Sequence, residues 1–505
     1  MLLALTAVVT YVPHIKNGGW YLDDWAFVAS LSQGAERDGV AGVLSAADAE
    51  TYRPGVVVVT SLLFAIGGEG QAAYLVVSAL LAALEGFLLW LVLRRIGVQP
   101  SLSVLTAVLL VVLPVIDSTR LWSAATSSTI SVCLMLLGAI FALKGLEGPS
   151  RRSQIAWHSA ATAAFLASVL TYELVAPLIC CMAAIYLFAG PRTGILVRWA
   201  ADLAAVTVGV LLLVDGGRQR GTKTDLDSLW LRSEQILDNA VEVFRFMLPG
   251  GSLLAGSLGV AVLIALAFGV GRAATLEGQA VRQWSLLGGS GALAALLGFV
   301  MLLPADPYYI PRIEGIGNRT GVVAALGGVV LLVSVVALSV YGAAALMRLC
   351  RWAPLAAAAL IVATALQFIS IEWSNQRAWA DSWVASQRVV AAVSGTLGPS
   401  PPRGLRVVTF RHQRVLLPAD VPVFDFPWDL RGAVRWRLGD ETADANAWAP
   451  QDRCDPEGVA ILGGGEVAKV MPYGQLYFVD VGGYRGYRVA NRAECLRMVG
   501  RLTAE

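Results

Sequence analysis

The stretch Trp20-Tyr21-Leu22-Asp23-Asp24-Trp25 sets two adjacent carboxylates between aromatic side chains, directly after the first apolar segment. Aromatic rings concentrate where a membrane meets water, so the acidic pair is expected just outside the lipid. Adjacent like charges raise the proton affinity of at least one carboxylate, which suits acid–base chemistry. A solvated loop with aromatic anchors explains the same six residues equally well. The stretch therefore leaves both roles open.

The composition around this stretch is that of a membrane protein. Charged residues make up 15% of the chain, and the mean hydropathy is +0.65, which excludes an ordinary soluble protein. Apolar runs close to the membrane-spanning length of about 20 residues recur until about position 370. We therefore expect a helical membrane domain over 1–395, a Pro-rich linker over 396–404 and a soluble domain over 405–505. Basic residues are scattered rather than clustered, so nucleic acid is not an expected partner.

The membrane domain is predicted to hold about eleven transmembrane helices. The first segment is too short to span a bilayer and lacks the marks of a signal peptide, so we expect its helix to have lost its cytoplasmic start. Residues 16–52 are expected to form a loop with a short surface helix over 40–47, and residues 54–66 a short re-entrant or interfacial helix. The expected spans are 1–13, 72–93, 102–116, 127–143, 155–170, 174–189, 197–214, 253–270, 284–303, 320–341 and 353–371.

Positive charge predicts the orientation of these spans. Lys and Arg residues fall in short loops that alternate along the chain, such as those holding Arg94, Arg151 and Arg351. Because such enrichment marks the cytoplasmic side, the N-terminus is predicted inside and the C-terminal domain outside. The acidic pair is then extracytoplasmic. A segment over 226–244 has apolar residues near one face, which is typical of a helix lying in the outer interface or packing on the bundle.

The C-terminal domain is predicted to be α/β or mostly β. Strand-like patterns cover 405–410 and 415–417, a hairpin is expected over 476–489, and 492–502 reads as a closing helix. Cys454 and Cys495 are the only cysteines in this domain, and an extracytoplasmic compartment permits a disulfide between them.

The outer half of the predicted bundle gathers ionisable groups that are costly to leave near lipid. Ionisable groups at membrane depth usually face a cavity, and the planar guanidinium of Arg suits phosphate oxygens. Each group also has a structural explanation: Arg53 could pair with an acid, Arg319 could anchor a helix end, and Glu173 could cap a helix. The residues concerned are Asp23, Asp24, Arg53, Asp117, Arg120, Tyr172, Glu173, Arg312, Glu314 and Arg319.

Taken together, several of these motifs resemble those of the GT-C superfamily of integral membrane glycosyltransferases. The motifs are Tyr21-Leu22-Asp23-Asp24-Trp25 after a first span, Tyr52-Arg53-Pro54 before the second, Tyr172-Glu173-Leu174, and Asn318-Arg319. The resemblance covers residues 1 to about 395, and the last two motifs resemble those of bacterial members of the family. The short first span departs from the family pattern.

The resemblance implies a chemistry and a set of roles. A polyprenyl-phosphate sugar would be the donor, and a glycan, lipid or protein of the cell envelope the acceptor, in a single displacement at the outer face of a bacterial plasma membrane. A carboxylate takes the proton of the attacking hydroxyl, and cations stabilise the departing phosphate. No second acidic cluster joins the pair, so no divalent metal or other cofactor is expected. Asp23 or Asp24 would be the base, and Glu173 would orient a substrate. The donor phosphate would be held by Arg53, Arg312 and Arg319. Further contacts with substrate would come from Trp25, Tyr21, Tyr172 and Arg120.

Two other functions remain open at this stage. A polyprenyl-linked glycan transporter would require internal repeats and interrupted helices near the midplane, and the sequence shows no repeat. A membrane scaffold could bind polysaccharide through outer-domain aromatics such as Trp428 and Trp436, although aromatics at strand spacing are more often core residues. The sugar is open as well: the Ala-, Val-, Gly- and Arg-rich composition suggests a GC-rich bacterium, and an actinobacterial source would favour a pentose such as arabinofuranose.

Overall fold

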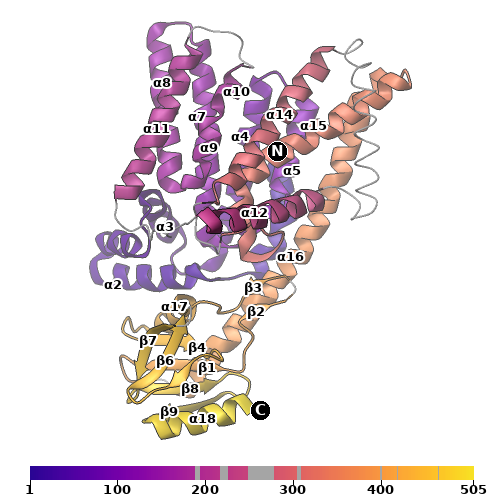
Figure 1. The fold of residues 1–505 in the computed structure, drawn as a ribbon. Helices are drawn as coiled ribbons and strands as arrows, with labels where there is room; N and C mark the ends of the chain where they lie inside the picture. Colours follow the sequence, from indigo (N-terminus) through magenta and orange to yellow (C-terminus); the bar gives the residue numbers. More distant parts are fainter. Residues whose placement is uncertain are drawn as a thin grey trace.

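Long apolar helices pack side by side at one end of the molecule, and a smaller domain of strands and helices is attached at the other (Figure 1). The computed structural model describes residues 1–187, 194–215, 226–247, 278–303, 309–398, 401–417, 419–463 and 466–504. In order, the helices of the first part are α1 (Leu2–Asn17), α2 (Asp23–Glu50), α3 (Pro54–Gly67), α4 (Gln71–Arg95), α5 (Pro100–Val111), α6 (Ser118–Leu121), α7 (Thr126–Glu147), α8 (Arg151–Thr171), α9 (Ala176–Cys180), α10 (Met182–Tyr186), α11 (Ile195–Asp215), α12 (Leu226–Met247), α14 (Gly278–Val300), α15 (Val322–Leu346) and α16 (Ala353–Leu397).

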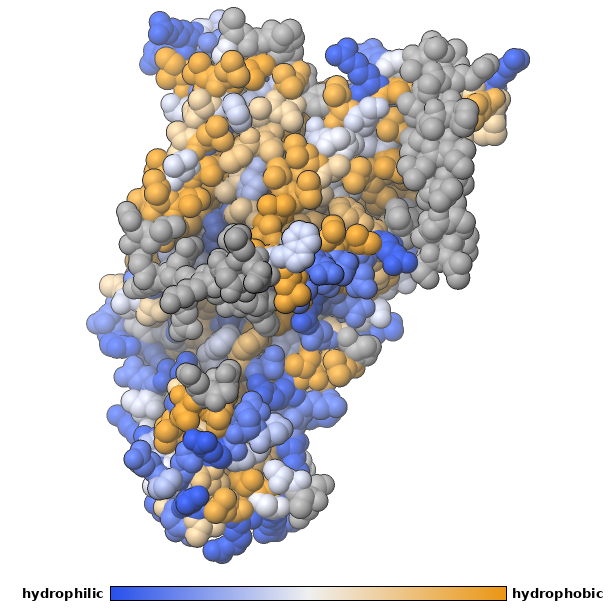
Figure 2. All heavy atoms as spheres, in the orientation of Figure 1, coloured by the Kyte–Doolittle hydropathy of each residue, from blue (hydrophilic) through white to orange (hydrophobic). Residues whose placement is uncertain are grey.

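The chain is a multi-pass membrane protein by the length and apolarity of these helices. Hydrophobic side chains gather over the bundle and hydrophilic ones over the attached domain (Figure 2). Leu196 and Val197 on α11 are 76% and 75% exposed, as expected of side chains that face lipid. Among the described residues, six helical segments are long and apolar enough to cross a membrane: Gln71–Arg95, Ser123–Glu147, Ile195–Leu213, Gly278–Val300, Gly315–Leu346 and Cys350–Leu397.

The prediction of about eleven spans is therefore not confirmed. The helix α8 is outside this set, and the predicted span over 174–189 is divided into the short helices α9 and α10 around Cys181. The helices α3 and α5 are apolar but short. The predicted span over 253–270 lies outside the described residues.

The segment between the first two predicted spans, expected as a loop with a short surface helix over 40–47, is mostly the helix α2. The helix folds back on itself at Asp38 and Gly39, where Gly39 has a φ of +58°. Its two arms touch closely, since a Cβ on Gly34 would lie 2.5 Å from the carbonyl oxygen of Gly42. Buried Leu31, Val43 and Ala47 then pack against α3. Apolar residues this widely spaced do not read as one periodic helix, which explains why the sequence predicted a loop.

The amphipathic segment forms α12, which crosses the long helices of the bundle (Figure 1). Its side chains at Ile236, Ala240 and Val243 are buried, whereas Trp230 on another face is 76% exposed. Both expected features, a face packed on the bundle and apolar groups turned outward, are present in one helix.

A single helix, α16, joins the bundle to the C-terminal domain, which is named the outer domain here after its predicted side of the membrane (Figure 1). Its 45 residues reach about 67 Å at 1.5 Å per residue. It continues past the last predicted span to Leu397, the second residue of the linker expected over 396–404.

The outer domain is α/β. A four-stranded sheet has the order β4-β1-β8-β9; β1 runs parallel to β4 and β8, and β8 and β9 form the expected antiparallel hairpin. Cys454 and Cys495 form a disulfide, with their Cα atoms 6.0 Å apart. The elements are β1 (Arg406–Phe410), β2 (Val415–Leu416), β3 (Val421–Pro422), α17 (Pro427–Leu438), β4 (Asp444–Ala447), β5 (Arg453–Cys454), β6 (Gly458–Gly463), β7 (Glu466–Pro472), β8 (Leu476–Asp480), β9 (Arg485–Val489) and α18 (Arg492–Ala504).

The outer domain is held against α2 by aromatic packing. The Trp25 ring is 1% exposed and lies 5.5 Å from the Trp383 ring on α16 and 5.7 Å from the Trp436 ring on α17, measured between centroids. A Cβ on Gly432 would lie 2.5 Å from the Ala26 nitrogen, so the backbones of α17 and α2 are in direct contact. This contact brings the start of α17 to the start of α2.

Candidate active site

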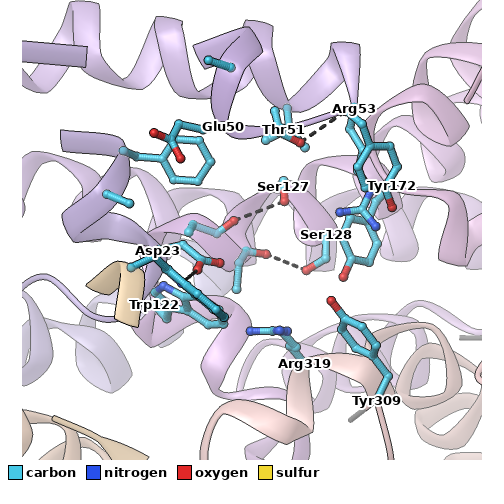
Figure 3. A pocket seen from close by; sticks show the side chains of 18 residues that line it. Asp23, Glu50, Thr51, Arg53, Trp122, Ser127, Ser128, Tyr172, Tyr309 and Arg319 are labelled. Atoms are coloured by element: carbon cyan, nitrogen blue, oxygen red, sulfur yellow. Dashed lines mark hydrogen bonds between the residues drawn. The ribbon is translucent and has the colours of Figure 1, made fainter. Parts of the chain in front are cut away.

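A cavity of about 570 Å³ lies where the bundle meets the outer domain. Its walls come from segments far apart in the sequence: α2, the start of α3, the start of α7, the turn after α8, the residues before α15, and α17. Figure 3 shows Arg53, Tyr172 and Tyr309 on the side opposite Asp23 and Trp122, with Arg319 reaching in from below. The lining residues are Asp23, Ala26, Phe27, Ala49, Glu50, Thr51, Tyr52, Arg53, Val56, Trp122, Ala124, Ala125, Ser127, Ser128, Tyr172, Tyr309, Arg319 and Trp428.

The two adjacent aspartates occupy different environments, although the sequence could not separate them. Asp23 lines the cavity and is partly exposed. Its Oδ1 accepts a hydrogen bond of 2.7 Å from the indole N–H of Trp428. Its other oxygen accepts none from the described residues. Asp23 therefore combines access to the cavity with an oxygen available to accept a proton.

Asp24 is buried and is saturated with hydrogen bonds. Its Oδ1 accepts bonds from the Ser123 hydroxyl at 2.6 Å and the Ala124 N–H at 2.7 Å, and its Oδ2 accepts one from the Tyr21 N–H at 3.1 Å. Burial raises the pKa of Asp24 to about 7, against the lowering effect of these three donors. Asp24 thus ties the start of α2 to the 3-10 turn Ser123–Ala125 that carries the cavity wall.

Arg53 is held by a carboxylate and two aromatic rings. Its Nε donates to Glu173 Oε2 at 2.7 Å and its Nη2 to Glu173 Oε1 at 2.5 Å. The guanidinium carbon lies 4.6 Å from the centre of the Tyr52 ring and 4.5 Å from that of Tyr172. The Tyr52 hydroxyl also donates to Glu173, at 3.2 Å. These contacts fix the guanidinium in the cavity wall and leave its second terminal nitrogen without a partner among the described residues.

Arg319 enters the same cavity without a carboxylate partner among the described residues. Its guanidinium carbon lies 4.5 Å from the centre of the Trp122 ring and 5.7 Å from that of Tyr309. Cation–π contacts of this kind position an arginine while leaving its N–H donors available. The cavity therefore holds two guanidinium groups, of which only Arg53 is neutralised by a carboxylate in the described part of the chain.

Hydroxyl groups and a second carboxylate complete the wall. Ser127 and Ser128 open α7, and their hydroxyls donate to the carbonyls of Ala124 and Ala125 at 3.2 and 2.6 Å. Glu50, at the end of α2, accepts a 2.6 Å hydrogen bond from Ser30. Among the described residues no three His, Cys, Asp or Glu side chains are grouped so that they could hold a metal ion. Two carboxylates, Asp23 and Glu50, line the cavity.

Glu173, expected to be catalytic, does not line the cavity. Both of its oxygens are engaged by Arg53, which makes it a partner of the phosphate-binding candidate rather than an acid or base. Glu173 therefore holds the Arg53 guanidinium in the cavity wall without lining the cavity itself.

Five other predicted site residues also lie outside the cavity: Asp24, described above, and Arg120, Arg312, Tyr21 and Trp25. Arg120 is 1% exposed inside the bundle, where its Nη2 donates to Glu85 at 2.9 Å. A guanidinium at this depth must be neutralised, and the pair with Glu85 on α4 does so.

Arg312 forms an ion pair with Asp420 of the outer domain, with 44% of its side chain exposed. It links the segment before α15 to the outer domain.

Tyr21 and Trp25 are packing residues. The Tyr21 hydroxyl donates to the Trp379 carbonyl at 2.9 Å, and the two rings meet edge to face at 4.8 Å. Trp25 belongs to the aromatic contact between α2, α16 and α17 described above. Both are 1% exposed and neither lines the cavity.

The sequence missed Trp122, Tyr309, Ser127, Ser128 and Glu50 as members of the site. The run Trp122-Ser-Ala-Ala-Thr-Ser-Ser carries hydroxyls at the mouth of an apolar span, and this polarity is a signal that could have indicated the wall. Trp428 was considered only as a sugar platform of a separate domain. No local pattern links it to Asp23, which is 405 positions away.

No family model and no curated protein matches this sequence. Solved structures are similar in fold. ArnT from Cupriavidus metallidurans in the apo state has a TM-score of 0.46 at 15% identity, over 88% of this chain and 84% of that chain. The same protein bound to undecaprenyl phosphate has a TM-score of 0.44 at 13% identity, over 89% and 86%.

The Archaeoglobus fulgidus oligosaccharyltransferase, tethered with an acceptor peptide, has a TM-score of 0.42 at 13% identity, over 87% of this chain. This chain covers only 62% of that protein's length. Similarities with TM-scores below 0.5 carry no argument about family or activity, so the function is argued from the residues of the cavity itself.

Proposed function

We propose that this chain is a membrane glycosyltransferase that moves a sugar from a polyprenyl-phosphate donor to a hydroxyl-bearing glycan, lipid or protein at the outer face of a bacterial plasma membrane. One observation carries the proposal. A single cavity at the edge of the bundle holds an available carboxylate, Asp23, opposite two guanidinium groups, Arg53 and Arg319. A base facing a cationic wall is what displacement of a phosphate by a hydroxyl requires.

In the proposed reaction Asp23 accepts the proton of the acceptor hydroxyl as its oxygen attacks the anomeric carbon. The bond between that carbon and the phosphate oxygen breaks, and the polyprenyl phosphate leaves with the electron pair. Arg53 and Arg319 stabilise the charge that develops on the phosphate. A phosphate leaves readily, so no general acid is assigned. A single displacement inverts the anomeric centre.

The remaining residues have positioning roles in this proposal. Asp24 fixes the start of α2 and the turn that carries Trp122, while Glu173 orients the Arg53 fork. Because the guanidinium groups supply the positive charge at the leaving phosphate, we expect turnover without a divalent metal. The identity of the sugar is left to experiment, with a pentose such as arabinofuranose as the first donor to test.

The test is sugar transfer by the purified full-length protein in nanodiscs, with a panel of synthetic polyprenyl-phosphate sugars, with and without chelator. Asp23→Asn is expected to lower kcat by at least about 100-fold, the usual range for removing a general base. Glu36→Gln, an exposed carboxylate on the same helix, is the matched control and keeps wild-type turnover. An active Asp23→Asn variant would refute the assignment of the base, and loss of turnover with chelator would refute metal independence.

The same experiment separates the other functions. A transporter or a polysaccharide-binding scaffold would bind donor or glycan without transferring sugar in the wild type, and Asp23→Asn would leave that binding unchanged.

A further inference from the structure

Trp428 is the one outer-domain residue in the wall of the cavity, as far as the chain is described. We propose that Trp428 is the positioning residue of the Asp23 carboxylate, so that the outer domain completes the active site of the membrane domain. This inference rests on the proposed function. It assigns to the outer domain a part in the chemistry, rather than only a role in binding glycan.

Residues that precede and follow Trp428 in the sequence fix the position of its indole. Its ring stacks on Phe426, with centroids 4.5 Å apart and planes inclined by 16°. The start of α17 is fixed by buried Asp429, whose Oδ2 accepts hydrogen bonds from the Asp425 N–H at 3.0 Å and the Phe426 N–H at 3.2 Å. The indole N–H therefore points at Asp23 from a rigid base.

The position of α17 relative to α2 is equally constrained. Gly432 lies one helical turn beyond Trp428, and a Cβ there would lie 2.5 Å from the Ala26 nitrogen and 2.6 Å from the Trp25 carbonyl carbon. The absence of a side chain at Gly432 allows the two backbones to touch. The donor on α17 and the acceptor on α2 are thus set by backbone contact.

The chemistry of the bond suits a general base. A neutral indole N–H holds one carboxylate oxygen and leaves the charge of the group in place, so that the other oxygen can take a proton. Glu173 provides the contrast within the same site. There the cation of Arg53 engages both oxygens, and no oxygen remains to act as a base.

The chain offers a matched control on the same helix. The indole N–H of Trp436 donates to Glu69 Oε2 at 3.1 Å, so it also joins α17 to a carboxylate of the membrane domain. Trp436 and Glu69 are not part of the cavity wall. The two tryptophans therefore make the same kind of bond across one interface, and only one of the bonds ends on the candidate base.

The experiment compares Trp428→Phe, Trp436→Phe and Asp23→Asn in full-length protein in nanodiscs. Kinetic constants are measured with whichever donor sugar the wild type transfers, and thermal unfolding is followed in parallel. Trp428→Phe is expected to lower kcat about 10- to 100-fold, the range for removing one hydrogen bond to a charged group. The donor KM stays within about twofold, because the arginines that hold the phosphate are unchanged. Trp436→Phe keeps wild-type kcat.

Trp428 is 40% exposed, so its replacement by Phe leaves no buried hole. As a second variant, Phe426→Leu removes the stacking ring while keeping the indole N–H, and we expect it to lower kcat by less than Trp428→Phe does.

Three outcomes would decide against the proposal. Wild-type kcat in Trp428→Phe with an inactive Asp23→Asn would refute the positioning role and leave the proposed function intact. Equal losses of kcat in Trp428→Phe and Trp436→Phe would show that Trp428 contributes only through packing between α17 and the membrane domain. Full activity in both Trp428→Phe and Asp23→Asn would refute Asp23 as the base and Trp428 with it, whereas the absence of any sugar transfer by the wild type would refute the proposed function itself.

Discussion

Neighbouring aspartates take opposite roles because successive side chains on a helix are rotated by about 100° from one another. At the first turn of α2 that rotation turns Asp23 toward the cavity and Asp24 into the contact with the Ser123–Ala125 turn. The two side chains are chemically identical, so the sequence alone does not distinguish their roles. What separates them is the set of donors that surrounds each one: the Ser123–Ala125 turn and Tyr21 supply those of Asp24, and α17 supplies that of Asp23.

The ion pair of Arg53 and Glu173 leads to a prediction at the same scale. Arg53→Lys keeps the charge but loses the planar fork that binds both Glu173 oxygens and stacks between two tyrosine rings. We expect the KM for the donor to rise about tenfold or more, a loss of about 1.4 kcal/mol, because an ammonium cannot make a two-point contact with phosphate. Steady-state kinetics with varied donor concentration measure the change.

Arg37→Lys is the control for this prediction. Arg37 pairs with Glu441 at the surface, where the two side chains are 62% and 58% exposed, and its replacement is expected to leave KM unchanged. An unaltered donor KM in Arg53→Lys would show that Arg53 does not bind the donor phosphate.

Much of the site could be predicted from the sequence where a single side chain carried the signal. Asp23, Arg53, Tyr172 and Arg319 are charged or aromatic residues at the ends of apolar segments, and all four line the cavity. Arg120 and Arg312 carried the same signal and lie elsewhere, since each has a nearer acidic partner, Glu85 and Asp420. Sequence patterns indicate that a charge needs a partner. They do not indicate which partner the fold supplies.

At the scale of elements, the cavity depends on how closely α17 packs against α2. Neither helix was predicted in full: α2 was expected as a loop with a short surface helix over 40–47, and α17 falls between the strand expected over 415–417 and the hairpin expected over 476–489. Both helices gain their stability from contacts between distant segments, such as the cluster of Trp25, Trp383 and Trp436. Local periodicity carries little information about helices of this kind.

Gly432 tests this contact. In Gly432→Ala the new methyl group would meet the Ala26 nitrogen at 2.5 Å, so α17 must move away from α2. We expect a destabilisation of about 1–3 kcal/mol, the usual cost of overpacking. Turnover should also fall, because the indole of Trp428 moves away from Asp23. Thermal unfolding and sugar transfer measure the two effects.

Gly500→Ala provides the comparison for Gly432→Ala. Gly500 lies in α18, and a Cβ there meets nothing within 4 Å. That variant should keep both its stability and its activity. Wild-type turnover in Gly432→Ala would mean that the fit between α17 and α2 does not matter to the chemistry.

At the scale of the whole molecule, the proposal requires the cavity, the outer domain and the end of α16 to share one side of the membrane. Charge in the short loops predicts that this side is outside. The polar outer domain and the apolar bundle are separated along the molecule (Figure 2), so the boundary between them marks one membrane surface. The start of α8, which carries Arg151 and Arg152, is predicted on the opposite side.

Cysteine labelling in intact cells tests this arrangement. Tyr484, which is 56% exposed in the turn between β8 and β9, is replaced by cysteine, and so is exposed Arg152 at the start of α8. A membrane-impermeant maleimide is expected to label Tyr484→Cys in intact cells and Arg152→Cys only after permeabilisation. The wild type, which retains its native cysteines, gives the background. Labelling in the reverse order would place the cavity in the cytoplasm, where the acceptor would then have to be a cytoplasmic molecule.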